Sequence, residues 1–417
     1  MTTWTAQKWI QSIAVAGLGI ASFCLNSPGY HPNSIIVVHG GSEAFALAES
    51  IVNHHSFSDP FKALPTGPSA HMAPLYPAYV AFIIAAFGRA AVAVGVLQTS
   101  VTLMFVLQLM LLPFLAKHFG LGFCTGFVAA LAWMAAGTPP TLVSEATPAG
   151  LLVILAAFLM RSAFTQKMSV KALLASGLVW GALLLLQPAM ILVLLAWLLL
   201  LHLRSPSSTA QKMALVVVPI IIASPWIVRN FLLFHKPVFV RDNLGIELAV
   251  SNNPCATYLA EINMNDGCYS RSHPNLSGEE ALKVRQLGEV EYNQVKLREA
   301  VHWIRDNPSS FAALSRQRFV AFWLPPFCSD PATGVLLRPW VLDLFTLASI
   351  AGVFVMWRNA RLSSYVTGIW LLCFPLIYYL IQSMVRYRYP ILWATFVPGS
   401  YFLTQLAQGL WDGLRTN

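Results

Sequence analysis

Long runs of apolar residues separated by short polar stretches dominate the chain. Several of these runs reach the roughly 17–25 residues that a helix needs to cross the hydrocarbon core of a bilayer. The pattern predicts an all-α polytopic membrane protein with about ten transmembrane helices. The expected spans are residues 9–25, 91–115, 121–138, 147–163, 172–186, 189–203, 213–230, 339–357, 364–384 and 389–409.

Residues 74–88 form an apolar segment that is short, contains two prolines in its first four residues, and is followed by Arg89. Counting this segment as a full span would invert every later loop and place the basic loops outside. We therefore predict a helix that lies along the membrane surface or is half-inserted.

Composition and charge agree with a membrane protein. Of the 417 residues, 57% are apolar and 10% are charged, against about 25% charged in an ordinary soluble domain. The net charge of +9 comes from Lys and Arg scattered singly or in pairs at helix ends, so we expect membrane lipid and exclude nucleic acid as a partner. With the N-terminus in the cytoplasm, the basic residues on the inner side are Lys117, Arg161, Lys167, Lys171, Arg204, Lys212, Arg358, Arg361 and Arg415.

Two stretches, residues 26–73 and 231–338, are too polar for the membrane. They divide the chain into a transmembrane module (1–230) with a first outer loop at 26–90, an extracytoplasmic domain (231–338) and C-terminal transmembrane helices (339–417). The outer loop is expected to carry membrane-surface helices, and the extracytoplasmic domain to be small and α-rich. Within that domain, residues 278–306 have a helical charge pattern that Asn307 and Pro308 end.

Six cysteines and several loop histidines raise the question of disulfides and metals. Cys255 and Cys268 lie in the predicted extracytoplasmic domain, where an oxidising compartment would permit a disulfide. Spacing alone does not settle the geometry, so paired and free states both stay open. No CxxC or HExxH pattern is present, and we predict no metal and no cofactor.

Two acids stand at the predicted outer face of the membrane. Glu43 begins a short amphipathic segment after the first span, and Glu145 lies in the short loop before the fourth span. A carboxylate at this boundary is costly unless it is solvated, paired or used. Both are candidates for catalysis, and the alternative is an ordinary loop acid or a charge favoured at a helix N-terminus.

Three arginines lie on the same predicted side and break the positive-inside pattern: Arg229, Arg386 and Arg388. An interfacial arginine can extend its head group into water while its stem stays in lipid. Several arginines around one bundle can instead bind a phosphate through paired hydrogen bonds. Together with the two acids, they suit a lipid-phosphate substrate.

The segments that carry these residues resemble a known family. Residues 43–88, with SIVNHHSFSDPF and TGPSAHMAPLYP, resemble the first outer loop of the GT-C membrane glycosyltransferases. That group includes protein O-mannosyltransferases and the aminoarabinose transferases of lipid A, and the similarity points to its bacterial branch. The resemblance continues in order through SPWIVRNFLLFHKPVFVRDNLGIELAVSNN, LGEVEYNQVKLREAVHWIRDNPSSFAAL, RQRFVAFW and RYRYP.

The resemblance implies a transferase that moves a sugar from a polyprenyl-phosphate donor to a hydroxyl of a lipid, glycan or protein, at the extracytoplasmic face of a bacterial inner membrane. Glu43 occupies the position of the general base, and Glu145 that of the second-loop acid. The family usually has Asp at both positions. Arg386 and Arg388 match the arginine that binds the donor phosphate, and His71 is a candidate to line the pocket.

Two other functions remain open at the level of sequence. A transporter should place acids and broken helices near the middle of the membrane, whereas these charges gather at one face, and no internal repeat is visible. A non-catalytic scaffold would use the extracytoplasmic domain only as a docking surface.

Overall fold

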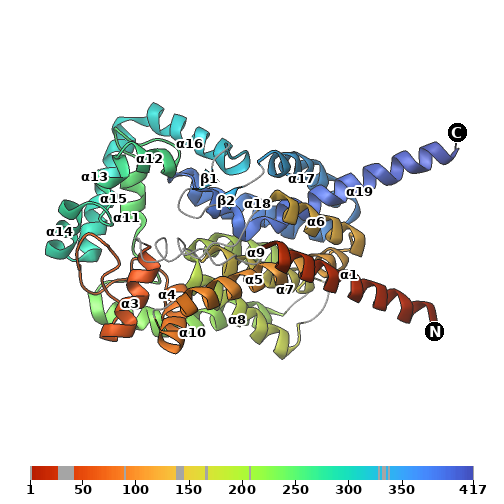
Figure 1. Cartoon of the computed structure of the whole chain (residues 1–417), viewed down its shortest axis with the longest axis horizontal. Coiled ribbons are helices and arrows are strands. Elements are labelled where there is room, and N and C mark those ends of the chain that lie inside the picture. Colours follow the sequence, from red (N-terminus) through yellow and green to blue (C-terminus); the bar gives the residue numbers. More distant parts are fainter. Residues whose placement is uncertain are drawn as a thin grey trace.

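The computed structural model describes residues 2–26, 42–88, 91–137, 145–164, 168–205, 208–326, 329–330, 335–336 and 339–416. Helices make up most of this part of the chain (Figure 1). The strands described, β1 (Ser329–Asp330) and β2 (Val335–Leu336), form one short antiparallel ribbon. Apart from this ribbon, the predicted all-α fold class is confirmed.

Five described segments are long and apolar enough to cross a bilayer, judged by length and composition. This supports an integral membrane protein, whereas the full set of ten spans stays a prediction. The five are Gln7–Asn26 in α1 (Thr2–Asn26), α5 (Ala91–His118), α10 (Thr209–Phe234), α17 (Pro339–Asn359), and Arg361–Tyr379, which joins α18 (Arg361–Cys373) to the 3-10 helix η2 (Phe374–Tyr379). Shorter apolar helices are α4 (Leu75–Phe87), α6 (Phe123–Ala136), α7 (Ala146–Ser162), α8 (Val170–Leu186), and η1 (Pro188–Met190) continued by α9 (Ile191–Arg204).

The last two predicted spans differ in detail from the observed helices. The α-helix expected over 364–384 ends at Cys373, where η2 begins with Phe374 and Pro375. The span expected over 389–409 is a 3-10 helix, η3 (Val385–Ile391), followed by α19 (Trp393–Thr416). Prolines account for both changes, because proline lacks the N–H that an α-helix interior requires.

Stacked tryptophans form part of the buried core of the helix bundle. Trp180 of α8 lies between Trp197 of α9 and Trp370 of α18, with ring centroids 5.8 Å apart in each pair. All three side chains are fully buried. Helices α17 and α19 also approach closely, because Gly352 lies against the Pro398 backbone, where a Cβ atom would clash. The helix bundle is therefore closely packed at these positions.

One end of the molecule carries the polar elements, and we call it the distal end. It contains α3 (Glu43–His54), α11 (Leu244–Ser251), α12 (Ala260–Asn265), α13 (Cys268–Ser272), α14 (Gly278–Leu287) and α15 (Glu289–Asp306). Both chain termini lie at the opposite end (Figure 1). From α15 the chain continues into α16 (Pro308–Trp323), which runs back toward the bundle (Figure 1).

The helical pattern predicted over 278–306 forms two helices rather than one. Gly288 separates α14 from α15 and has a φ of 80°, which glycine adopts more readily than other residues. The predicted end is confirmed, since α15 stops at Asp306 and α16 begins at Pro308. The division of the chain at 230 and 338 stays a prediction.

Candidate active site

Glu43 is the first residue of α3, at the distal end. Ser42 precedes it in an extended conformation, and the helix buries one face through residues such as Phe45, Leu47 and Ala48. A carboxylate at a helix N-terminus is favoured by the partial positive charge there. The side chain keeps 19% of its surface exposed, so it is both held in place and accessible.

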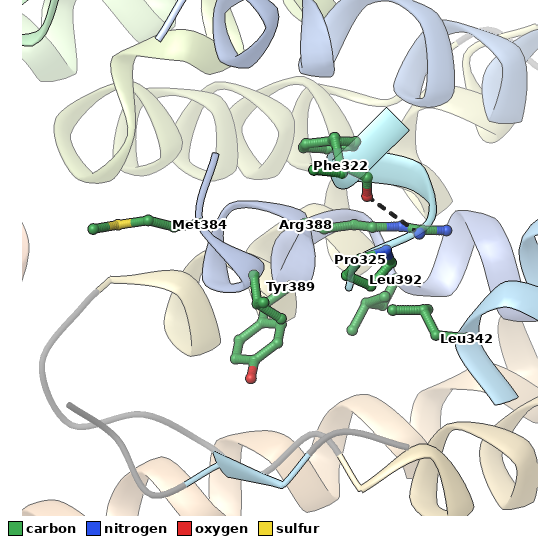
Figure 2. Close-up of a pocket in the computed structure, with 9 residues that line it drawn as sticks. Phe322, Pro325, Leu342, Met384, Arg388, Tyr389 and Leu392 are labelled. Carbon is green, nitrogen blue, oxygen red and sulfur yellow. Dashed lines mark hydrogen bonds between the residues drawn. The ribbon is translucent and has the colours of Figure 1, made fainter. Parts of the chain in front are cut away.

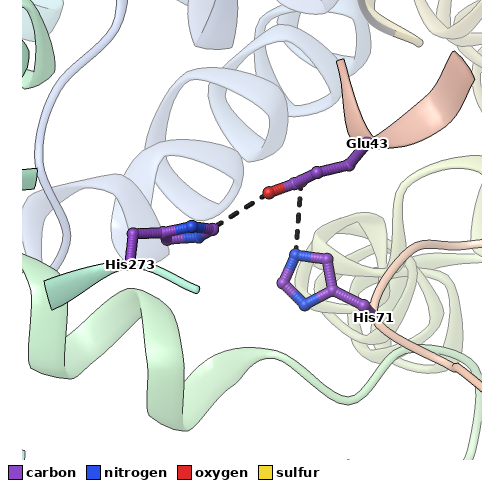
Figure 3. A group of neighbouring side chains, drawn as sticks. All are labelled: Glu43, His71 and His273. Carbon is purple, nitrogen blue, oxygen red and sulfur yellow. Dashed lines mark ion pairs between the residues drawn. The ribbon is translucent and has the colours of Figure 1, made fainter. Parts of the chain in front are cut away.

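Two histidines from distant parts of the sequence meet the Glu43 carboxylate (Figure 3). His71 Nε2 lies 3.2 Å from Glu43 Oε2, and His273 Nε2 lies 3.7 Å from Oε1. His71 is fully buried, and His273 keeps 2% of its surface exposed. We call Glu43, His71 and His273 the Glu43 triad. Each carboxylate oxygen therefore faces its own imidazole.

The pKa values of the three triad residues depend on one another and on burial. Burial alone would raise the pKa of Glu43, but the adjacent His71, with smaller contributions from His273 and Arg241, outweighs it and lowers that pKa to about 2. For His71 the same pairing overcomes burial and raises the pKa of the imidazole. For His273 burial prevails and lowers the pKa. Glu43 is therefore an anion throughout the physiological pH range.

Hydrogen bonds with two side chains, those of Glu289 and Arg241, hold the loop that carries His71. Glu289, at the start of α15, accepts hydrogen bonds from the Ser69 hydroxyl and from the Ala70 N–H, both at 2.6 Å. The Ser69 hydroxyl in turn accepts the N–H of His71 at 2.9 Å. Arg241 donates its Nε–H to the His71 carbonyl at 2.8 Å. His71 is thus positioned by segments more than 150 residues further along the chain.

A disulfide and a stacked ring hold the segment that carries His273. Cys255 and Cys268 are bonded, so the open question left by their spacing is settled in favour of the pair. Cys268 begins α13, and His273 follows that helix directly. The Tyr269 ring stacks on His273 with centroids 4.5 Å apart. Nothing in the sequence around His273 signalled this role, because its partners come from other segments.

The guanidinium groups of Arg229 and Arg388 donate hydrogen bonds to other parts of the protein. The terminal nitrogens of Arg229 donate to the carbonyls of Ser69 and Phe57 at 2.7 and 3.0 Å. Those of Arg388 donate to the Trp323 carbonyl and to the Thr346 hydroxyl, among others, at 2.6 and 2.8 Å. This geometry favours structural roles for both residues over the phosphate binding predicted from the sequence.

Arg388 also borders a pocket between α16, α17 and η3 (Figure 2). The other side chains of this pocket are mostly apolar, among them Phe322, Leu342 and Leu392. The guanidinium of Arg388 reaches toward the carbonyl of Phe322 (Figure 2). The terminal nitrogens of Arg388 are therefore already taken up by protein oxygens and do not face an anion in this pocket.

Glu145 and Arg386 are two further charges whose electrostatic influence overlaps that of the triad. Glu145 precedes α7, and Arg386 lies in η3. Both charges act on the Tyr387 hydroxyl. Tyr269 connects these charges to the triad, because its hydroxyl interacts with the charges of both Glu43 and Arg386. The predicted acids and one predicted arginine therefore act electrostatically on neighbouring, partly buried tyrosines, Glu43 on Tyr269, Glu145 on Tyr387 and Arg386 on both.

The Glu43 triad is also a set of potential metal ligands. One ligand atom from each residue can be chosen so that all lie within 4.8 Å of one another, and two imidazoles with a carboxylate are a common donor set. His273 Nδ1, however, accepts the Asn275 N–H at 3.1 Å. In the neutral ring the proton therefore sits on Nε2, directed at Glu43. A protonated Nε2 cannot bind a metal, so the residues as arranged fit a cluster of two carboxylate–imidazole ion pairs better than a metal centre. The absence of a metal stays a prediction.

Comparison with solved structures finds the same fold in an archaeal enzyme. The oligosaccharyltransferase AglB from Archaeoglobus fulgidus, in complex with an inhibitory peptide and a dolichol-phosphate, matches with a TM-score of 0.56 and 11% identity. The apo form of the Archaeoglobus fulgidus oligosaccharyltransferase matches with a TM-score of 0.57 and 13% identity. Each match covers 98% of this chain and 52% of the other.

These matches define the fold and not the family. Identities of 11% and 13% are too low to carry an activity across, and the chain spans about half the length of the proteins it matches. No protein-family model and no curated protein matches the sequence. The class defined by fold and site is a helical membrane protein built like an oligosaccharyltransferase, with a buried carboxylate–imidazole site at its distal end.

Proposed function

We propose that this protein is a GT-C-type glycosyltransferase that moves a sugar from a polyprenyl-phosphate donor to an acceptor hydroxyl. The observation that carries the proposal is the Glu43 triad, an ionised carboxylate fixed between two imidazoles at the end of a membrane bundle. The fold shared with an oligosaccharyltransferase supports it, and so does the family resemblance of the segments around Glu43.

The proposed reaction gives roles to Glu43, Arg386 and Glu145. The acceptor oxygen attacks the anomeric carbon of the sugar, the bond from that carbon to the phosphate oxygen breaks, and the lipid phosphate leaves with the electron pair. Glu43 accepts a hydrogen bond from the attacking hydroxyl and takes its proton as the new bond forms. Arg386 stabilises the negative charge on the departing phosphate. Glu145 helps to shape the acceptor side.

The ligands of one similar structure support the choice of donor. The AglB complex holds a dolichol-phosphate and an inhibitory peptide, and a lipid phosphate is the leaving group that this proposal requires. We extend the acceptor class to lipids, glycans and proteins, because any of them can present a hydroxyl. The reaction takes place at the extracytoplasmic face of a bacterial inner membrane, where the predicted orientation places the distal end.

Turnover and binding, measured separately, test the role of Glu43. Purified protein in nanodiscs is incubated with a panel of polyprenyl-phosphate sugars, and donor consumption and donor affinity are followed. Glu43→Gln keeps the shape of the side chain but removes its charge, so we expect unchanged donor affinity and turnover reduced by about 100-fold or more.

A neighbouring acid on the same helix provides the control. Glu49→Gln removes a carboxylate from α3 without touching the triad, and we expect turnover within about twofold of the native protein. Full turnover in Glu43→Gln would remove this residue as the base. Failure of the native protein to bind any of the donors would overturn the transferase assignment itself.

A further inference from the structure

We propose that Arg241 binds the phosphate of the lipid-linked donor together with Arg386, an inference that rests on the proposed function. Arg241 lies in the irregular segment between α10 and α11, and its side chain keeps 24% of its surface exposed. Its Nε–H is anchored on the His71 carbonyl at 2.8 Å. This anchor ties a cation to the loop that carries one member of the Glu43 triad.

The terminal nitrogens of Arg241 remain available for a ligand. Among the residues that the structure describes, neither terminal nitrogen has a hydrogen-bond partner, and the nearest acid, Glu247, lies 3.9 Å from one of them. Arg229 and Arg388 differ, since backbone carbonyls and hydroxyls take up their terminal nitrogens. A guanidinium anchored by Nε and open at its two ends is suited to bind two phosphate oxygens at once.

The charge of Arg241 influences both the Glu43 triad and Tyr387. It acts on every member of the Glu43 triad and also on the Tyr387 hydroxyl, where the charge of Arg386 acts as well. An anion placed near Tyr387 would therefore be attracted by two cations that come from separate segments. The phosphate of a donor whose anomeric carbon faces Glu43 is such an anion.

Glu247 makes the binding of an anion competitive. Its carboxylate faces Arg241 and accepts a hydrogen bond from the Asn243 side chain at 3.0 Å. It also acts on the Tyr387 hydroxyl, so its negative charge opposes a phosphate at the same place. Removing this charge should strengthen phosphate binding, whereas removing Arg241 should weaken it. The two changes have opposite signs.

A binding measurement with the leaving group alone tests the proposal. Full-length protein in nanodiscs is titrated with undecaprenyl phosphate, which lacks the sugar. Arg241→Gln is expected to raise the Kd about tenfold or more, and Arg241→Lys to raise it less because the charge is kept. Glu247→Gln is expected to lower the Kd by about a few-fold. The control is Arg298→Gln on α15, whose native side chain is 65% exposed and whose loss should leave the Kd unchanged.

The outcomes separate this inference from the proposed function. If native protein binds undecaprenyl phosphate and Arg241→Gln binds it equally well, the role of Arg241 is wrong while the transferase assignment stands. If native protein does not bind it, the lipid-phosphate donor fails, and this inference fails with it. If Arg241→Gln lowers the melting temperature, Glu247→Gln decides, because a gain of affinity cannot come from unfolding. No gain in that variant would overturn the inference.

Discussion

Glu289 shows how a single buried carboxyl can couple loop geometry to pH. Burial raises its pKa to about 7, although His71 and the hydrogen bonds from Ser69 and Ala70 oppose the shift. Asp242 lies nearby and adds to the shift, and its own pKa is raised by burial to about 6. The folded protein therefore binds a proton at Glu289 more tightly than the unfolded chain does.

We predict that Glu289→Gln removes part of the pH dependence of stability. A pKa that rises on folding from 4.5 to about 7 makes a contribution that is complete below pH 4.5 and is lost as pH rises through 7. The loss amounts to at most about 3 kcal/mol. The glutamine amide keeps an acceptor for the Ala70 N–H, offers the Ser69 hydroxyl oxygen a donor in place of the native acceptor, and does not ionise.

Melting temperatures in detergent, recorded from pH 5 to pH 8, check this prediction. The native protein should lose stability relative to Glu289→Gln as pH rises. Glu279→Gln serves as the control, because that side chain is 81% exposed and its loss should leave the native curve unchanged. Parallel curves for native protein and Glu289→Gln would contradict the prediction.

At the scale of single residues, the sequence could not distinguish an arginine with a structural role from one that could bind a ligand. Arg386 and Arg388 stand two residues apart in one motif and give the same signal at a membrane boundary. Only the fold shows that Arg388 is buried against carbonyls and hydroxyls, while Arg386 shares the surroundings of Tyr387. Arg241 gave no signal of its own, because its importance comes from the His71 carbonyl far away in the sequence.

At the scale of elements, the short helix α13 links a covalent bond to the Glu43 triad. The bond between Cys255 and Cys268 holds the start of this helix, which then delivers Tyr269 and His273 to the site. A helix of 5 residues is too short to be stable by itself in water. The disulfide and the stacked ring therefore define where His273 lies.

We predict that breaking this disulfide reduces turnover more than donor affinity. Cys255→Ser combined with Cys268→Ser should loosen the segment, because a disulfide of this kind stabilises by about 2–4 kcal/mol. His273 would then lose its position at Glu43, whereas Arg241 and Arg386 come from other segments. We expect turnover to fall by about tenfold or more. The affinity for undecaprenyl phosphate, measured in parallel, should change by less than about threefold.

The three free cysteines described, Cys24, Cys124 and Cys373, provide the matched control. Replacing them by alanine should leave the activity sensitive to a reducing agent, since the disulfide remains. Insensitivity of that variant to reduction, or full turnover in the double serine variant, would show that the bond does not position His273.

At the scale of the whole molecule, hydropathy predicted the kind of protein well and the individual helices less well. The five longest apolar segments correspond to predicted spans, because helix length and apolar content are set locally. The ends of α18 and the start of α19 were missed, because Pro375 and Pro390 interrupt runs that are apolar throughout. The joining of Glu43, His71 and His273 depends on tertiary contacts between segments as much as 230 residues apart, which no local pattern contains.

The arrangement of the ends predicts the orientation in the membrane. Both termini lie opposite α3 and α11–α15 (Figure 1), and the positive-inside rule assigns the terminal side to the cytoplasm. In a variant in which Cys24, Cys124, Cys328 and Cys373 are replaced by alanine, we introduce either Arg285→Cys on α14 or Asp412→Cys on α19, both at exposed positions. A membrane-impermeant maleimide applied to intact cells should label the first variant and should label the second only after the membrane is disrupted. The reverse pattern would place the Glu43 triad in the cytoplasm and exclude a donor presented at the outer face.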